Sequence, residues 1–308
     1  MPPSAPARRL EPSPDADDGL ALRYYRVTAD DGTRLRAWTN DVDGPTVLLC
    51  NGLGTNPYCW PALLDPRCGV RVISWNERGV SGSERPADPS HIGIDWFTRD
   101  AVAVLDDAGV DSCVVAGWSI GVNTMFELTL RHPHRVSGLF AVAGVPGDTF
   151  ATMLAPLLVP RPLRKPVTVS LARLLRLGGG PVHQVTRRLP VGTLTRLLTH
   201  SGFMLPVPDV ELARRAVAEF LATPVDWYMT LALHSSLHPR ISLRDVQVPT
   251  AFVAGRYDLL AGARDMATAA ARVAGAAYVE MKGSHFLPME RPGELHDLLL
   301  ELLGTVHG

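Results

Sequence analysis

The feature of this 308-residue chain that most restricts its fold is a Gly-Trp-Ser-Ile-Gly pentapeptide at residues 117–121. An apolar run, 112–116, precedes it, and a helix-like stretch opens at Val122. A strand that reverses into a helix within so few residues brings the positions two before and two after the serine against each other, so only small residues fit there. The pattern predicts a strand, a tight turn and a helix, with Ser119 at the helix N-terminus.

Ser119 at such a turn is predicted to be a nucleophile, because the N–H groups and the dipole at a helix N-terminus stabilise negative charge that develops nearby. A serine hydroxyl needs a histidine as general base and a carboxylate that orients the histidine. Asp258 follows an apolar run at 249–254, and His285 follows a β-like run at 276–281. We therefore predict catalytic roles for Ser119, Asp258 and His285, in that chain order.

Each of these features also has a simpler interpretation when taken alone. The pentapeptide is compatible with an ordinary glycine-rich turn, and Asp258 with a turn carboxylate that caps a helix starting near Ala261. His285 is one of ten histidines in the chain. Their joint occurrence, with the acid and the base each at the end of a predicted strand, favours the catalytic interpretation.

A loop at 51–54, Asn-Gly-Leu-Gly, lies between a predicted strand at 46–50 and a predicted helix. Its glycines let backbone N–H groups approach a substrate oxygen closely. We predict that the N–H groups of Leu53 and Ile120 form an oxyanion hole, with a plain strand-to-helix turn as the alternative. One such donor stabilises a tetrahedral intermediate by roughly 2.7–4 kcal/mol in other enzymes.

With these motifs in this order, the chain from about 24 to 303 resembles the α/β-hydrolase family. The segment 76–86, Asn-Glu-Arg-Gly-Val-Ser-Gly-Ser-Glu-Arg-Pro, is similar to the family's D-x-R-G-x-G-x-S-x-x-P turn after its fourth strand. The chain departs from the family at three positions: Asn51 replaces a histidine, Asn76 an aspartate and Ser81 a glycine. These positions support loops, so the departures concern local geometry and substrate fit more than mechanism.

The coarse pattern of elements agrees with this resemblance. A hairpin is predicted around residues 30–32, Asp-Asp-Gly, and strands then alternate with helices, which implies a parallel sheet covered on both faces. The predicted fold class is α/β, with a mostly parallel twisted sheet of about eight strands covered by helices and a helical cap insertion. We predict a core domain of 21–145 and 238–308, a cap at 146–237, and a disordered leader at 1–20 that is not a signal peptide.

The family's cap lies over the carboxyl edge of the strands, where it excludes water and shapes the substrate pocket. Six residues of the predicted cap are candidates for lining that pocket, with core packing as the alternative: Met153, Phe203, Met204, Trp227, Tyr228 and Met229. The resemblance also makes Asp148 a rival for the acid role, because some family members carry their acid after the sixth strand. We favour Asp258.

The predicted function is hydrolysis of a carboxylic ester or lactone of a small apolar substrate through an acyl-enzyme intermediate. A serine where the family's haloalkane dehalogenases and epoxide hydrolases carry aspartate weighs against those two activities. Because fold and triad do not fix the acceptor, a carbon–carbon bond hydrolase, an acyltransferase, a perhydrolase and a non-catalytic small-molecule receptor remain alternatives. No cofactor or metal is predicted, since no dinucleotide or zinc motif occurs. The particular substrate and the oligomeric state stay open.

Composition restricts partners and compartment. The formal net charge is −1, Lys and Arg are spread through the chain, and no basic stripe stands out, so no nucleic-acid partner is predicted. No run of about 18 uncharged apolar residues occurs, so no membrane span is predicted. The cysteines have no metal spacing and are interpreted as reduced packing residues, which favours a cytoplasmic location; they are Cys50, Cys59, Cys68 and Cys113.

Overall fold

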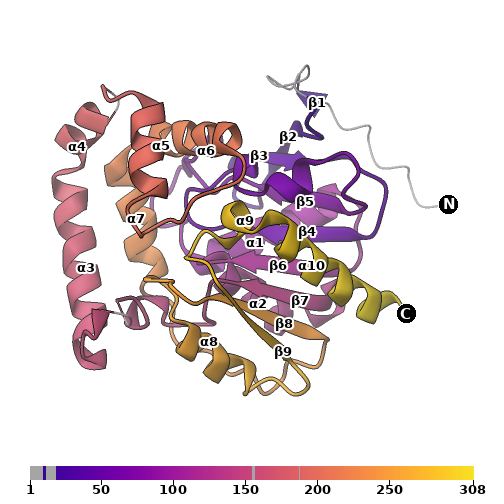
Figure 1. The fold of residues 1–308 in the computed structure, drawn as a ribbon. Helices are drawn as coiled ribbons and strands as arrows, with labels where there is room; N and C mark the ends of the chain where they lie inside the picture. The colour runs from indigo at the N-terminus through magenta and orange to yellow at the C-terminus, as the bar shows by residue number, and fades with distance from the viewer. Residues whose placement is uncertain (1–9, 12–18, 155–156, 187) are drawn as a thin grey trace.

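The computed structural model describes residues 10–11, 19–154, 157–186 and 188–308, which build a nine-stranded sheet flanked by helices (Figure 1). The described strands are β1 (Leu10–Glu11), β2 (Arg23–Thr28), β3 (Arg34–Thr39), β4 (Thr46–Cys50), β5 (Arg71–Trp75), β6 (Cys113–Trp118), β7 (Val136–Val142), β8 (Thr250–Gly255) and β9 (Ala277–Met281). Their order across the sheet is β1-β2-β3-β5-β4-β6-β7-β8-β9. β1, β2 and β3 pair antiparallel, as do β3 and β5, and the strands from β4 to β9 run parallel. The predicted α/β fold class with a mostly parallel sheet is confirmed.

Helices connect the parallel strands. Those around the sheet are α1 (Ile94–Asp107), α2 (Gly121–Arg131), α8 (Ala263–Ala270), α9 (Leu287–Glu290) and α10 (Pro292–His307). The 3₁₀ turns are η1 (Pro57–Cys59), η2 (Pro61–Leu64), η3 (Pro133–Arg135) and η4 (Thr149–Ala151). Between β7 and β8 the chain leaves the sheet and forms α3 (Arg161–Leu177), α4 (Gly179–Thr186), α5 (Val191–Thr199), α6 (Val210–Ala222) and α7 (Val225–Ser235). These five helices gather on one side of the molecule, and we call them the helical insertion (Figure 1).

Both faces of the sheet are covered, because side chains along each strand alternate between two apolar clusters. In β4, Leu48 and Cys50 belong to a cluster with α1, α2 and α8, whereas Val47 and Leu49 belong to a cluster with η2 and α10. None of these four side chains is more than 1% exposed. Burial on both faces explains why the parallel strands are continuous apolar runs in the sequence.

The predicted leader and the predicted cap lie only partly within the described residues. Most of the predicted leader, 1–20, lies outside the described residues; within it, Leu10 and Glu11 form β1 and pair with Tyr25 and Tyr24 of β2. The stretch predicted as a cap, 146–237, contains η4 and the helical insertion in its described part. Across the described ranges, the structure has no helix with the length and apolar character needed to cross a bilayer.

A fully buried arginine links the turn after β5 to the rest of the core. The Arg78 guanidinium donates to both carboxylate oxygens of Asp100 on α1, at 2.9 and 2.6 Å, and to Asp31 in the β2–β3 turn at 2.5 Å. It also donates to the carbonyl oxygen of His91, at 3.2 Å. A buried charge is tolerated only when it is paired and hydrogen-bonded. The network therefore fixes the turn against the hairpin and α1.

We expect Arg78→Met to lower the free energy of unfolding by about 3–5 kcal/mol, because the buried carboxylate of Asp100 and the partly buried carboxylate of Asp31 lose their counter-charge. Urea denaturation of the purified variant measures this loss. The control is Arg99→Met, which removes an exposed ion pair with Asp30 and should cost at most about 1 kcal/mol. Equal losses in the two variants would contradict a structural role for the buried network.

Candidate active site

The turn between β6 and α2 holds Ser119 at the carboxyl end of the central strand. Ser119 has a φ of 56°, in the left-handed region, and its N–H donates to the carbonyl oxygen of Val142 on β7 at 3.0 Å. A Cβ added to Gly121 would lie 2.0 Å from the carbonyl oxygen of Cys50, and one added to Gly117 would lie 2.8 Å from Val122 Cα. Both glycines are therefore required by close backbone packing, which is the reason the sequence analysis gave for them.

One chain of hydrogen bonds joins three of the predicted site residues. His285 Nε2 lies 2.7 Å from Ser119 Oγ, and His285 Nδ1 lies 2.9 Å from Asp258 Oδ2. Asp258 and His285 are buried, whereas Ser119 is half-buried. Two residues more than 160 positions apart in the chain thus share a hydrogen bond at one edge of the sheet. This is the geometry of a nucleophile, a base and an orienting acid.

Asp258 has two functions in the local structure. Its Oδ1 accepts from the backbone N–H groups of Leu260 and Ala261, at 2.7 and 2.8 Å, while Oδ2 faces the histidine. One oxygen therefore caps the turn and the other faces His285, and the catalytic role of Asp258 stays a prediction. The rival acid, Asp148, is bonded instead to Lys165 Nζ at 2.6 Å.

The backbone around His285 is held by a residue that the sequence analysis did not single out for this purpose. Trp118 Nε1 donates to the carbonyl oxygen of His285 at 2.9 Å, and the Trp118 side chain is buried. Because Trp118 immediately precedes Ser119, the same turn positions both the hydroxyl and the segment that carries the base. The family motif leaves this position open, so only the folded geometry identifies the role.

The two predicted oxyanion donors lie on either side of the serine. Ile120 follows Ser119 at the start of α2, and Leu53 lies in the loop after β4. That loop contacts the serine directly, since a Cβ on Gly52 would lie 3.4 Å from Ser119 Cβ. Neither the Ile120 N–H nor the Leu53 N–H donates to an acceptor among the described residues. Their role in binding an oxyanion stays a prediction.

Helix α7 of the helical insertion packs against this region. Trp227 and Leu231 share an apolar cluster with Ile120 and Leu53, the two residues predicted to supply the oxyanion donors. The indole N–H of Trp227 donates to the carbonyl oxygen of Arg78 at 2.9 Å. One helix of the insertion is therefore fixed both to the candidate oxyanion loop and to the turn after β5.

Aromatic side chains of the insertion approach the site from two sides. A Cβ on Gly54 would lie 2.7 Å from the ring of Tyr228, so Tyr228 rests on the loop after β4. On the other side, the ring centroid of Phe203 lies 5.3 Å from that of Phe286, which in turn lies 5.7 Å from the His285 ring. The remaining predicted lining residues are the buried Met204 and the half-buried Met153 and Met229.

Glu77 is a second residue that the sequence analysis missed. Its Oε2 accepts from the Gly54 N–H at 3.0 Å, so it holds the loop that carries Leu53. The side chain is buried, and burial raises the pKa of Glu77 to about 8, although the bond from Gly54 opposes this shift. Glu77 lies between Asn76 and Arg78 in the predicted family turn, and this polar sequence context does not mark it as a buried residue.

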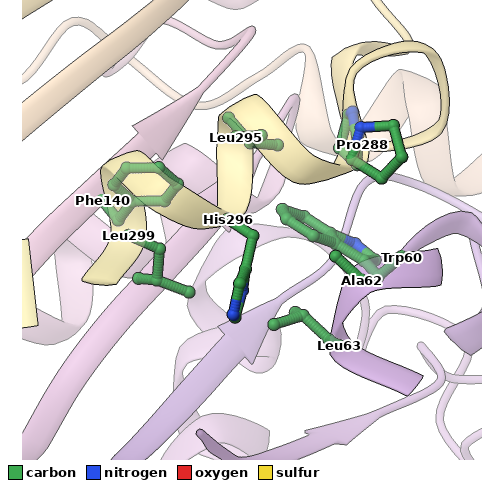
Figure 2. Close-up of a pocket in the computed structure, with 9 residues that line it drawn as sticks. Trp60, Ala62, Leu63, Phe140, Pro288, Leu295, His296 and Leu299 are labelled. Atoms are coloured by element: carbon green, nitrogen blue, oxygen red, sulfur yellow. The ribbon is translucent and has the colours of Figure 1, made fainter. Parts of the chain in front are cut away.

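Two further features of the described residues concern metal and ligand binding. No group of three or more His, Cys, Asp or Glu side chains is placed to hold a metal ion within the described ranges. An apolar pocket between η2 and α10 has room for only about 10 Å³, and its lining includes Trp60, Leu63 and His296 (Figure 2). His296 Nε2 lies 2.9 Å from the carbonyl oxygen of Cys68. This pocket includes none of the candidate site residues and is a packing gap.

Comparison with known proteins agrees with the architecture. Residues 45–163 match the family model of the α/β-hydrolase fold. Epoxide hydrolase A of Mycobacterium tuberculosis is 28% identical in an alignment that covers 90% of this chain and 96% of that protein. The enol-lactonase from Burkholderia xenovorans has a TM-score of 0.65 and 21% identity, covering 91% of this chain and 99% of that one. A thermophilic esterase from Thermogutta terrifontis has a TM-score of 0.67 and 20% identity, covering 92% and 99%.

The fold and the site together define the class of protein. A mostly parallel sheet covered on both faces carries a serine at a strand-to-helix turn, and that serine is bonded to a histidine from the loop after β9. Together with the family model that matches residues 45–163, these features show that the chain has the α/β-hydrolase fold. The predicted resemblance is confirmed at this level.

We expect the stability of the protein to depend on the protonation of Glu77. Between the ordinary carboxyl pKa of 4.5 and about 8, the folded protein keeps a proton that the unfolded chain releases, so stability falls as pH rises through this window. Glu77→Gln still offers an acceptor to Gly54 and does not ionise. The difference in free energy of unfolding, variant minus wild type, should therefore increase with pH. The expected increase is on the order of 1 kcal/mol per pH unit between about pH 5 and pH 8.

Urea denaturation at several pH values measures this difference. Glu301→Gln, at an exposed position of α10, is the control change. A difference between Glu77→Gln and wild type that stays constant across the window would refute the assignment of the titration to Glu77.

Proposed function

We propose that this hydrolase of the α/β fold family cleaves a carboxylic ester or lactone of a small apolar substrate through a serine acyl-enzyme. The observation that carries the proposal is the hydrogen-bonded chain from Asp258 through His285 to Ser119, with distances of 2.9 and 2.7 Å. The N–H groups of Leu53 and Ile120, which have no acceptor among the described residues, lie on the two segments that flank the serine.

The proposed mechanism has two halves. The Ser119 Oγ attacks the substrate carbonyl carbon while His285 Nε2 takes the hydroxyl proton, and the oxyanion accepts hydrogen bonds from Leu53 and Ile120. The protonated imidazole, held by Asp258, then gives its proton to the leaving alkoxide, which leaves the acyl group on the serine. In the second half His285 removes a proton from water, water attacks the acyl carbonyl, and Ser119 recovers its proton as the acid is released.

The helical insertion is proposed to act as a cap over this site. Trp227 and Leu231 pack against the two residues that supply the proposed oxyanion donors, and Tyr228 packs on the neighbouring Gly54. Walls of this kind exclude water and favour apolar substrate groups. The substrate proposed is therefore small and apolar around its carbonyl, which also agrees with the esterase and the enol-lactonase named among the similar structures.

Epoxide opening is the activity named for one similar protein, and the nucleophile argues against it here. A carboxylate that opens an epoxide forms an ester, which water can cleave at the carbonyl carbon. Ser119 would instead form an ether, which has no carbonyl for water to attack and would leave the enzyme alkylated. The serine thus supports acyl chemistry.

Several activities share the first half of this mechanism. An acyltransferase or a perhydrolase would use an alcohol or hydrogen peroxide in place of water, and a carbon–carbon bond hydrolase would break a different bond next to the carbonyl. Product analysis with each acceptor separates them. A non-catalytic receptor would bind the substrate without turnover, and the complete Ser119, His285 and Asp258 chain makes this alternative weaker.

A cytoplasmic location is part of the proposal. It is supported by the four cysteines, all of which are free and buried. Their burial agrees with reduced thiols that serve packing, since disulfides form and persist mainly in oxidising compartments.

We expect Ser119→Ala to lower the kcat for activated short-chain esters and lactones by at least about a thousandfold, because the variant has no nucleophile. Turnover is measured with a panel of both substrate classes. A serine-directed phosphonate should inactivate the wild type and add one covalent group, which mass spectrometry places on Ser119.

The matched control is Ser112→Ala, at an exposed position just before β6, which should keep wild-type turnover and labelling. Turnover in Ser119→Ala equal to that of the control would refute the proposed mechanism. Absence of any turnover in the wild type, with thermal stabilisation by a panel compound, would favour the receptor alternative.

Asp258→Asn should lower kcat by about a thousandfold to ten-thousandfold, because an asparagine amide donates to His285 Nδ1 and leaves the ring in the wrong tautomer. The asparagine keeps an oxygen for Leu260 and Ala261, so the turn survives. Asp148→Asn, which removes the charge paired with Lys165, should change kcat less than twofold. Steady-state kinetics of both variants tests the assignment, and the reverse order of effects would make Asp148 the acid.

A further inference from the structure

The helical insertion carries a concentrated positive charge. Residues 149–208 contain no Asp or Glu and eight Lys or Arg. This segment therefore has a formal charge of +8, and the rest of the chain carries −9 to give the net −1 of the whole. No continuous run of charges marks this segment in the sequence, because its basic residues are spread among apolar residues. The excess charge emerges only when the absence of acidic residues from 149 to 208 is counted.

The same segment exposes apolar side chains. Ten of the fifteen exposed large apolar residues in the described chain lie between 157 and 197. On α3 they include Leu163, Val167, Leu171 and Leu174, which are 52, 45, 52 and 66% exposed. Their spacing of four, four and three residues places them on one side of the helix. We call this side the outer face of α3.

The outer face is directed away from the molecule. The opposite side of α3 carries the buried Thr168 and Ala172, and α3 packs on α7 (Figure 1). Arg173 lies at the border between the outer face and the groove that α3 forms with α7, and it has no carboxylate partner among the described residues. Arg176 lies within that groove, on the side of α3 opposite the outer face. No described residue covers the exposed leucines or pairs with Arg173.

The chemistry of the outer face selects one occupant. A second copy of the chain would bring two segments of +8 together, and this repulsion opposes a symmetric pair. Single-stranded nucleic acid binds basic grooves through stacking on aromatic rings, and α3 contains no aromatic residue. A bilayer with anionic headgroups satisfies both kinds of side chain, because leucines enter the acyl boundary and arginines bind the headgroups. A helix of 17 residues lying in the bilayer plane offers about 25 Å of such contact.

We propose that the outer face of α3 binds the surface of an anionic phospholipid bilayer as a peripheral membrane contact. Leu163, Val167, Leu171 and Leu174 insert at the boundary between headgroups and acyl chains, and Arg173 binds a lipid phosphate, while the +8 charge of residues 149–208 attracts the anionic surface. The contact needs no covalent step and no other ligand. It is independent of the proposed ester hydrolysis, because it rests only on the exposed surface of the insertion.

The test is co-sedimentation of the full-length protein with phosphatidylcholine vesicles that contain or lack phosphatidylglycerol, at low and at high salt. We expect binding to the anionic vesicles, weaker binding at high salt and little binding to phosphatidylcholine alone. Soluble poly-glutamate, which offers negative charge without an apolar phase, should not displace the protein from the anionic vesicles.

Two variants separate the apolar and the electrostatic parts. Leu171→Ser with Leu174→Ser should weaken binding by roughly tenfold or more, through lost insertion. Arg173→Gln should weaken it by about fivefold, through the loss of one charge at the bilayer surface. Leu300→Ser and Arg244→Gln are the matched exposed controls from other surfaces and should bind as the wild type does. Thermal unfolding verifies that each variant is folded.

Several results would overturn the proposal. These are absence of sedimentation with anionic vesicles, equal binding to both vesicle types, and full displacement by poly-glutamate, which would identify an acidic polymer as the occupant. Dimerisation of the wild type that the two leucine changes abolish, seen by sedimentation velocity, would identify a second copy instead. Because vesicle binding is measured without substrate, a failure of the ester assay leaves this test unaffected.

Discussion

The close packing of backbone around Ser119 is the constraint on which the rest of the site depends. A Cβ on Gly121 would lie 2.0 Å from the carbonyl oxygen of Cys50, and one on Gly144 would lie 2.3 Å from that of Ser119. The ends of β4, β6 and β7 therefore meet with no side chain between them. This contact holds the serine in its left-handed conformation and sets the loop after β4 beside it, so that the positions of the base and the acid follow from the order of the strands.

These features can be predicted from the sequence because they are local. Glycines at 117 and 121 are required wherever a strand turns sharply into a helix, and apolar runs of five or six residues mark strands buried on two faces. In the structure, β4 has the predicted bounds, 46–50, and each end of β6 lies within two residues of the apolar run at 112–116. The choice between Asp148 and Asp258 was of another kind, since both follow strands. It depended on which of the two carboxylates the histidine in the loop after β9 would face. In the structure His285 faces Asp258, and Asp148 is bonded to Lys165.

What the sequence could not provide depends on contacts between distant segments. Glu77 is an ordinary acidic residue in a turn until the fold buries it against the Gly54 N–H. Likewise, a leucine-rich helix such as α3 has the pattern of a core helix, and its exposure is decided by the number of its sides that neighbours cover. Ser81, which stands where the family has glycine, also shows its cost only in the fold. Its φ of 42° lies in the left-handed region that favours glycine, and its buried hydroxyl has no partner among the described residues.

Helix α7 connects the two parts of the molecule that carry the proposals. One side packs on α3, whose outer face is proposed to meet the bilayer, and the other carries Trp227 and Leu231 against Ile120 and Leu53. Trp227 is in turn bonded to the carbonyl oxygen of Arg78, which the buried ion network holds in place. α7 therefore connects α3 to the candidate oxyanion loop, and its bond to the Arg78 turn holds α7 in place. The insertion is thus anchored at the candidate site and exposed at its far side, so the two proposals use different surfaces of the same helices.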